Sequence, residues 1–259
     1  MIPTESLRDL RSTAPAVVRA AALLAVLAEP GVEALGLSDL ARRLDLPKST
    51  VANLCSALEQ VGFVRRVDGR FELGHRLLEL GAAYSDRIDI IHEFKAATGR
   101  LRWASQETIQ LAILEGAEII YLARHDGTQP VRLAAGLGRR MPAPCTALGK
   151  AMLAELDPAE VRARIGALPT FPVLTPKSKH NMAELMEDLD GTRARGYAID
   201  DEENSVGVVC YGVALPTVGP NSPRRAISVT LLKARETADL RERLVGDLRD
   251  LAADLSPHL

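Results

Sequence analysis

The sequence predicts an α+β protein, in which a small helical part ending in a β-hairpin precedes a larger part built on a mainly antiparallel sheet. Three observations support this class. Residues 15–60 contain three segments with apolar side chains at helical spacing. Two short strand-like runs then flank Asp68-Gly69, a dipeptide typical of tight hairpin turns. After Thr108, strand-like and helical segments mix without a strict βαβ alternation, which favours antiparallel pairing.

The composition is typical of a reduced, cytoplasmic protein with one large or two medium domains. The 259 residues are 47% hydrophobic and carry a net charge of −2, which argues against a surface coated with positive charge but allows a small basic patch. The three cysteines, Cys55, Cys145 and Cys210, form no CxxC pair. Arg19 interrupts the apolar segment 14–28, so we expect neither a signal peptide nor a membrane span.

The N-terminal part starts with a polar segment of mixed charge, residues 1–13, which we expect to be a mobile arm. A first helix is expected over residues 15–28, where apolar residues predominate. Ser38 is the expected N-cap of a second helix over residues 39–45.

A third helix is expected from Lys48 to Gln60, after a turn at Leu46-Pro47. Its apolar side chains recur at helical spacing and should face the core: Val51, Leu54, Leu58 and Val61. The opposite face carries small or polar side chains: Ser49, Ala52, Asn53 and Ser56. Gly62 is expected to end the helix.

The segment "FVRRVDGRFEL" predicts two short strands around the Asp68-Gly69 turn. The order helix, helix, helix, hairpin over residues 14–74 predicts a winged helix-turn-helix, a fold that places a helix in the major groove of DNA. An ordinary small α+β subdomain is the alternative.

Residues 75–88 are expected to form a linker helix, and residues 89–259 a second domain with an antiparallel sheet. The expected strands of this domain are residues 108–116, 118–127, 131–138, 197–201, 207–217 and 224–234. Its expected helices lie near residues 89–105, 146–156, 158–166, 181–196 and 236–255.

Several of these segments resemble one family. The stretch "DLARRLDLPKSTVANLCSALEQVGFVRR" resembles the DNA-binding half of IclR-type transcriptional regulators. The stretches "GLGRRMPAPCTALGKAMLA" and "RGYAIDDEENSVGVVCYGVALP" resemble their effector-binding half. The resemblance covers about residues 15–255 in the family's order. It implies a GAF-like second domain that senses a small molecule, and a homodimer or dimer of dimers on double-stranded operator DNA.

The third helix carries the residue types that read DNA. Lys48, Ser49 and Thr50 at its N-terminus can bind phosphate together with free backbone N–H groups. On its outer face, next to Ala52, Asn53 is the best candidate for a bidentate base contact, and Ser56 follows one turn later. A solvated helix face is the alternative for Asn53.

The hairpin adds Arg65, Arg66 and Arg70, which can follow the DNA backbone or the minor groove, or else form a solvated rim. Residues 40–72 hold six basic and four acidic side chains, a balance of +2. One such domain should therefore bind DNA weakly, and a dimer on two half-sites about one helical turn, or a multiple of it, apart is expected.

The resemblance also implies an effector cavity between the sheet and the helix that begins near Thr146, with the backbone N–H groups of Ala147 and Leu148 facing the ligand. A helix N-terminus with free donors favours a carboxylate. Asp200, Val208, Cys210, Ser228 and Thr230 match positions at which family members contact their ligands. Because nearby residues are mostly apolar, we expect a small organic or aromatic acid. The alternatives are a buried structural cysteine, hydroxyls satisfied within the sheet and, for Asp200, a solvated acidic turn.

The sequence gives little support to the hypothesis that this protein is an enzyme. The glycine-rich stretch near Gly149-Lys150 lacks the spacing of a Walker motif, and Met141 takes the last glycine position of a GxGxxG pattern. His92-Glu93 does not continue to HExxH, and no residue cluster suggests a metal or cofactor. Cys210 as a thiol nucleophile has no supporting context. The remaining rival is a sensor that acts through protein contacts and uses the helix-turn-helix only for dimerisation.

Overall fold

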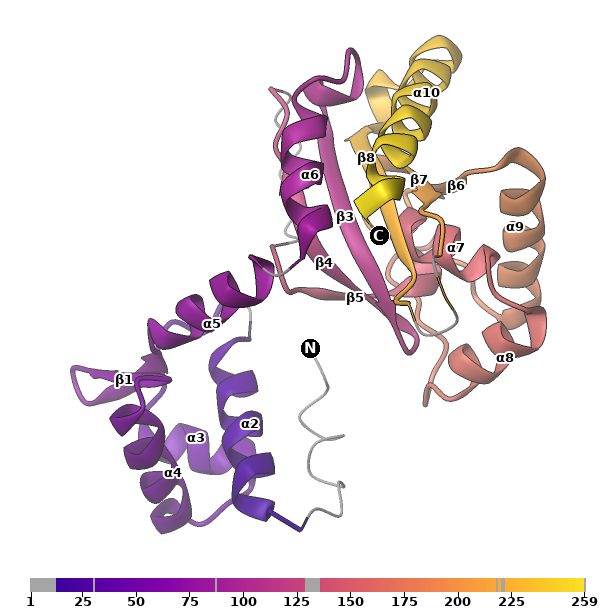
Figure 1. Ribbon diagram of the computed structural model, residues 1–259. Coiled ribbons are helices and arrows are strands. Elements are labelled where there is room, and N and C mark those ends of the chain that lie inside the picture. Colours follow the sequence, from indigo (N-terminus) through magenta and orange to yellow (C-terminus); the bar gives the residue numbers. More distant parts are fainter. Residues whose placement is uncertain are drawn as a thin grey trace. The chain divides into compact units, whose positions relative to one another are not determined.

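The computed structural model describes residues 13–29, 31–86, 88–128, 136–217, 219 and 222–258, so all but Thr13 of the expected N-terminal arm lies outside the described residues. The chain divides into two compact units, Met1–Arg87 and Ile88–Leu259 (Figure 1). Each unit has its own hydrophobic core.

The first unit has the helices and the hairpin that the sequence predicts. Its elements in order are α2 (Pro15–Leu27), α3 (Leu37–Leu44), α4 (Lys48–Gln60), β1 (Val64–Val67), β2 (Arg70–Leu73) and α5 (Arg76–Ser85). Leu23, Leu40 and Val51 are fully buried and come from α2, α3 and α4, so the three helices close one core. The linker role expected of α5 stays a prediction.

Two tight turns fix the shape of this unit. Asp68 and Gly69 have φ angles of 49° and 77°, which is the left-handed pair that a two-residue hairpin turn requires. At the end of α4, Gly62 has a φ angle of 77°, and the N–H of Phe63 donates to the carbonyl of Leu58 at 2.9 Å. This Schellman arrangement ends the helix and sends the chain into β1.

Two details of the sequence prediction are wrong. Ser38 is not an N-cap, because α3 already begins at Leu37 and the extended residue before it, Gly36, takes that place. Val61 is 51% exposed instead of buried. α4 ends at Gln60, one residue before Val61, so the Val61 side chain turns away from the core. Cys55, one turn after Val51, is buried in the helix interface.

The second unit is built on one six-stranded sheet with the order β5-β4-β3-β8-β7-β6. Its strands are β3 (Thr108–Glu115), β4 (Glu118–His125), β5 (Arg140–Pro142), β6 (Ala198–Asp201), β7 (Val208–Ala214) and β8 (Arg225–Leu232). Every strand pair in the described part of the chain is antiparallel, as predicted. Most of the strand expected at residues 131–138 lies outside the described residues.

Helices cover both faces of this sheet (Figure 1). They are α6 (Asp89–Thr98), α7 (Ala147–Ala154), α8 (Pro158–Gly166), α9 (Met182–Arg195) and α10 (Ala238–Leu255). Alternate side chains of the strands point to opposite faces of the sheet and pack into two cores. Leu111 packs with α6 and α10, whereas Ala112 packs with α7 and its neighbours. None of the helices described is long and apolar enough to cross a membrane.

Candidate functional site

The outer face of α4 is a polar stripe. Lys48, Ser49, Asn53 and Ser56 are exposed, and Thr50 and Ala52 are half-buried. Positions 49, 53 and 56 are four and three residues apart, so these side chains lie on one side of the helix. The sequence predicted this grouping, and α4 brings all six residues within its first three turns.

The N-terminus of α4 is open to an anion. Pro47 is its N-cap, and no side chain caps the first turn. The N–H groups of Lys48, Ser49 and Thr50 therefore have no partner in the helix, and they carry the positive end of its dipole. With the Lys48 ammonium beside them, these groups match the donors that bind phosphate.

The three arginines of the hairpin differ in their contacts with the rest of the first unit. Arg65 pairs with Glu72, with 2.6 Å between Nε and Oε1, so part of its charge is neutralised. The Arg66 guanidinium lies over the Phe71 ring, 4.7 Å from its centroid. Arg70 is exposed beside the turn.

In the second unit, a small pocket lies between the N-terminus of α7 and the sheet; it is called the cavity below. Of the seven residues expected there, five line it: Ala147, Leu148, Asp200, Cys210 and Ser228. Thr230 lies one step away, where its Oγ1 is 3.1 Å from the Cys210 sulfur, and Val208 packs against the core. The other lining residues, which were not predicted from the sequence as ligand contacts, are Gln110, Tyr121, Thr146 and Asn204.

The N-terminus of α7 comes unusually close to the sheet. A Cβ atom on Gly212 would lie 2.5 Å from the Ala147 carbonyl oxygen, so only glycine fits there. Thr146 caps the helix and accepts the N–H of Gly149 at 2.9 Å. No hydrogen bond within the described part of the chain uses the N–H of Ala147 or Leu148, so two donors remain at the cavity.

Asp200 faces these donors from β6 and is 2% exposed. Its Oδ1 accepts the backbone N–H groups of Glu203 and Asn204 at 2.8 and 3.1 Å. Burial raises the pKa of Asp200 to about 7, although those N–H groups and Lys150 act in the opposite direction. Asp200 is therefore present in both protonation states near neutral pH.

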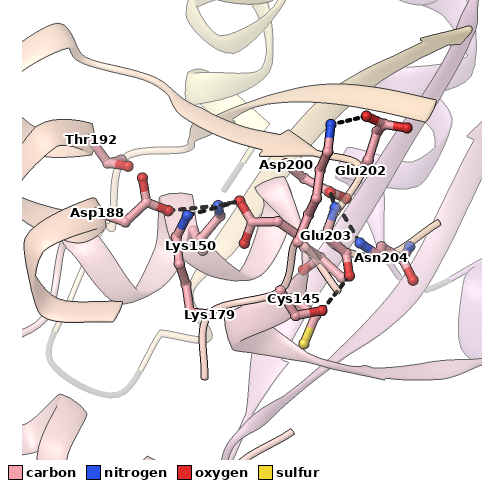
Figure 2. Close-up of polar contacts among 12 residues, drawn as sticks. Cys145, Lys150, Lys179, Asp188, Thr192, Asp200, Glu202, Glu203 and Asn204 are labelled. Carbon is pink, nitrogen blue, oxygen red and sulfur yellow. Dashed lines mark hydrogen bonds and ion pairs between the residues drawn. The ribbon is translucent and has the colours of Figure 1, made fainter. Parts of the chain in front are cut away.

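A buried ion cluster supports the loop that follows β6 (Figure 2). Lys150 of α7 is 0% exposed, and its Nζ lies 2.6 Å from both Asp188 Oδ2 and Glu203 Oε1. Burial lowers the pKa of Lys150, but the attraction of Glu203 and Asp188 outweighs this and holds it above its ordinary value. The Ser178 hydroxyl donates to the Glu203 carbonyl at 2.6 Å. The segment that positions Asp200 and Asn204 is thus anchored to α7 and α9.

The buried thiols are poor nucleophiles. Burial, and next the charge of Asp200, raises the pKa of Cys210 well above its ordinary value. Burial likewise raises the pKa of Cys145 to about 11. Both thiols stay protonated at neutral pH, so nothing here supports the nucleophile alternative for Cys210. Within the described residues, no three His, Cys, Asp or Glu side chains are grouped so as to hold a metal ion.

Two family models match the chain. A helix-turn-helix domain of the IclR type matches residues 16–68, and the C-terminal domain of the bacterial transcriptional regulator IclR matches residues 82–257. The transcriptional repressor AllR of Escherichia coli is 34% identical over 252 residues, which cover 95% of this chain and 90% of AllR.

Solved structures agree in fold. An IclR transcriptional regulator from Alicyclobacillus acidocaldarius has a TM-score of 0.82 at 25% identity and covers 94% of this chain and 98% of its own. An IclR homologue from Microbacterium hydrocarbonoxydans, complexed with 4-hydroxybenzoate, has a TM-score of 0.78 at 23% identity, with 94% and 98% covered.

Proposed function

This chain belongs to the IclR family of bacterial transcriptional regulators, and from that premise we propose that it binds double-stranded operator DNA in the cytoplasm under the control of a small organic or aromatic acid. The observation that carries the DNA-binding part is the exposed polar stripe of α4, with unpaired N–H groups at its start. In this proposal Asn53 and Ser56 contact base edges, with Ala52 facing the groove between them. Lys48, Ser49 and Thr50 hold phosphate, and Arg65, Arg66 and Arg70 follow the backbone.

We propose that the working unit is a homodimer, which pairs further into a dimer of dimers. The low charge of the DNA-binding part supports this, because two joined copies double the number of phosphate contacts. Large apolar side chains also lie exposed on the first unit: Leu78 at 77%, Tyr84 at 57% and Val17 at 67%. Burial of such side chains against a second copy would be favourable.

The cavity supports an acid as the effector. The two unpaired N–H groups at the start of α7 favour a carboxylate. The Asp200, Ser228 and Cys210 side chains lie on the sheet side of the same cavity. The 4-hydroxybenzoate in the complex of the Microbacterium homologue carries such a carboxylate.

The DNA-binding part predicts a loss of affinity in two single variants. We expect Asn53→Ala to weaken binding of the DNA upstream of the gene by about tenfold or more, because a bidentate base contact is worth about 1–3 kcal/mol. Lys48→Ala should weaken binding to all sequences and lower the slope of log affinity against log salt by about 1. Fluorescence anisotropy titrations at three salt concentrations measure both effects.

Lys95→Ala is the matched control, because it removes one exposed lysine from α6 in the other unit. It should leave affinity and salt slope unchanged. Wild-type affinity in both α4 variants would refute the placement of α4 in the major groove. A wild-type protein that shows no salt-dependent binding to this DNA would instead favour the rival in which the first unit serves dimerisation only.

The effector part predicts that binding of an acid weakens as pH rises. Ionised Asp200 repels a second anion in the same cavity, so binding draws on the protonated form, which is lost above a pKa of about 7. We expect 4-hydroxybenzoate, with its ionised carboxylate, to bind about tenfold more weakly at pH 8 than at pH 6. Calorimetry across this range measures the effect.

Asp200→Asn keeps the acceptor for the Glu203 and Asn204 N–H groups but cannot ionise, so its affinity should be flat between pH 6 and 8. Ser228→Ala and Cys210→Ala should reduce the thermal stabilisation that the acid gives. If stabilisation persists unchanged in both variants, the ligand binds elsewhere.

A further inference from the structure

Gln110 stands out among the residues that line the cavity. It lies on β3, opposite Ser228 of β8, which in turn lies opposite Gly212 of β7. These three residues form one row across the sheet, and Gly212 lies against the start of α7. The Gln110 side chain is 2% exposed and borders the same cavity as the Ala147 and Leu148 N–H groups.

The amide nitrogen of Gln110 is a free donor within the described part of the chain. This Nε2 atom is fully buried and makes no hydrogen bond within the described part of the chain. Five other buried side-chain atoms share this state, but they belong to charged residues that make ion pairs or other polar contacts: Glu72, Glu107, Asp201, Glu203 and Arg225. Gln110 is the neutral exception among them.

An unpaired buried donor is costly, so native proteins keep few of them and often at functional sites. Other polar side chains of the cavity are already engaged: Asp200 Oδ1 accepts two N–H groups, Thr146 caps α7, and Cys210 contacts Thr230. Tyr121, Asn204 and Ser228 also line the cavity, but among all its lining side chains only Gln110 has a donor atom that is both fully buried and without a hydrogen-bond partner in the described part of the chain.

We propose that Gln110 determines which acids act as effectors, by donating through Nε2 to a second oxygen of an acid whose carboxylate lies at the start of α7. This inference rests on the proposed effector site. A carbonyl oxygen beside the carboxylate accepts such a bond, and comparison with a variant that lacks the Gln110 donor separates the contribution of Gln110 from that of the other cavity groups. The preferred effectors are accordingly oxygen-substituted acids, and plain alkyl or aryl acids bind less well.

Two pairs of acids test this with calorimetry, because each pair differs by one carbonyl oxygen: pyruvate against propionate, and phenylglyoxylate against phenylacetate. The wild-type protein should bind the oxo member of at least one pair about tenfold more tightly. Gln110→Met, of similar length but without a donor, should bind both members of that pair equally. Its melting temperature without ligand should equal or exceed that of the wild type, because an unpaired amide is removed from the interior.

Gln106→Met is the matched control, since Gln106 is exposed two residues before β3. It should keep the preference for oxo acids. A preference that persists in Gln110→Met, or a wild-type protein that binds acids without preference, would overturn the role of Gln110 and leave the acid effector standing. A marked fall in the melting temperature of Gln110→Met alone would indicate a structural amide and also overturn it. A wild-type protein that binds none of the four acids would overturn both this inference and the acid effector.

Discussion

Replacement of Lys150 by methionine should lower the free energy of unfolding by about 3–5 kcal/mol, the usual cost of removing one partner from a buried ion pair. Lys150 is fully buried and bonds Asp188 and Glu203 at 2.6 Å each. Methionine fills much of the same space, so the loss reports on charge. Without the ammonium, two carboxylates face each other in the interior, of which Glu203 is 3% exposed.

The loss of stability in the Lys150→Met variant should depend on pH. Unpaired carboxylates take up protons more readily in the folded variant than in the unfolded chain, so the variant loses stability as pH rises. Urea unfolding at pH 5 and pH 8 should show the larger deficit at pH 8. A second change, Glu203→Gln, should recover part of the loss in the Lys150→Met background, because it removes one of the uncompensated charges.

Lys179→Met is the control for Lys150, since it makes the same substitution against the same partner. Lys179 Nζ lies 3.5 Å from Glu203 Oε1, and its side chain is 28% exposed. Because a partly solvated pair contributes little, we expect a change of less than about 1 kcal/mol. Equal effects of the two variants would contradict the special role of the buried lysine.

Replacement of Gly212 by alanine should be the second most damaging change, with a loss of at least about 2 kcal/mol. The added Cβ would meet Ala147 O at 2.5 Å, Ala147 C at 2.6 Å and Leu148 N at 3.1 Å. These are backbone atoms, so no side-chain rotation relieves the clash, and α7 must move away from β7. Because the same N–H groups face the cavity, acid binding should weaken together with stability. Thermal unfolding with and without 4-hydroxybenzoate measures both.

Gly246→Ala provides the matched control for this change. Gly246 lies within α10, and a Cβ there would meet nothing within 4 Å. Since alanine favours the helix over glycine, we expect the free energy of unfolding to rise by up to about 1 kcal/mol. A neutral Gly212→Ala variant would show that α7 is free to shift, and the cavity would then be less rigid than the structure indicates.

Local sequence determined most of the first unit. The helix over Lys48–Gln60 and the turn at Asp68-Gly69 follow from side-chain spacing and from the backbone angles that Asp and Gly tolerate. The errors were local as well. Ser38 and Val61 lie at helix ends, where one residue more or less decides which side chain faces the core.

The candidate site was only partly predictable. Family resemblance led to Asp200, Cys210 and Ser228, which do line the cavity. Gln110 was missed, although a glutamine within the apolar run "TIQLAIL" was a usable signal. Gln110 reaches the cavity because β3 pairs with β8 in the register that places it opposite Ser228, which lies 118 positions further along the chain (228 − 110).

By itself, then, the sequence determined where helices and strands form and which face of α4 is polar, because backbone angles and side-chain periodicity act over a few residues. Two features were decided only by the tertiary structure. Lys150 bonds Asp188 and Glu203, which lie 38 and 53 residues away. The start of α7 packs directly against Gly212, where a larger residue would clash. Such contacts depend on the register of the whole sheet and on helices packed against it. No short window of sequence contains that information, because burial and pairing arise only when distant segments meet.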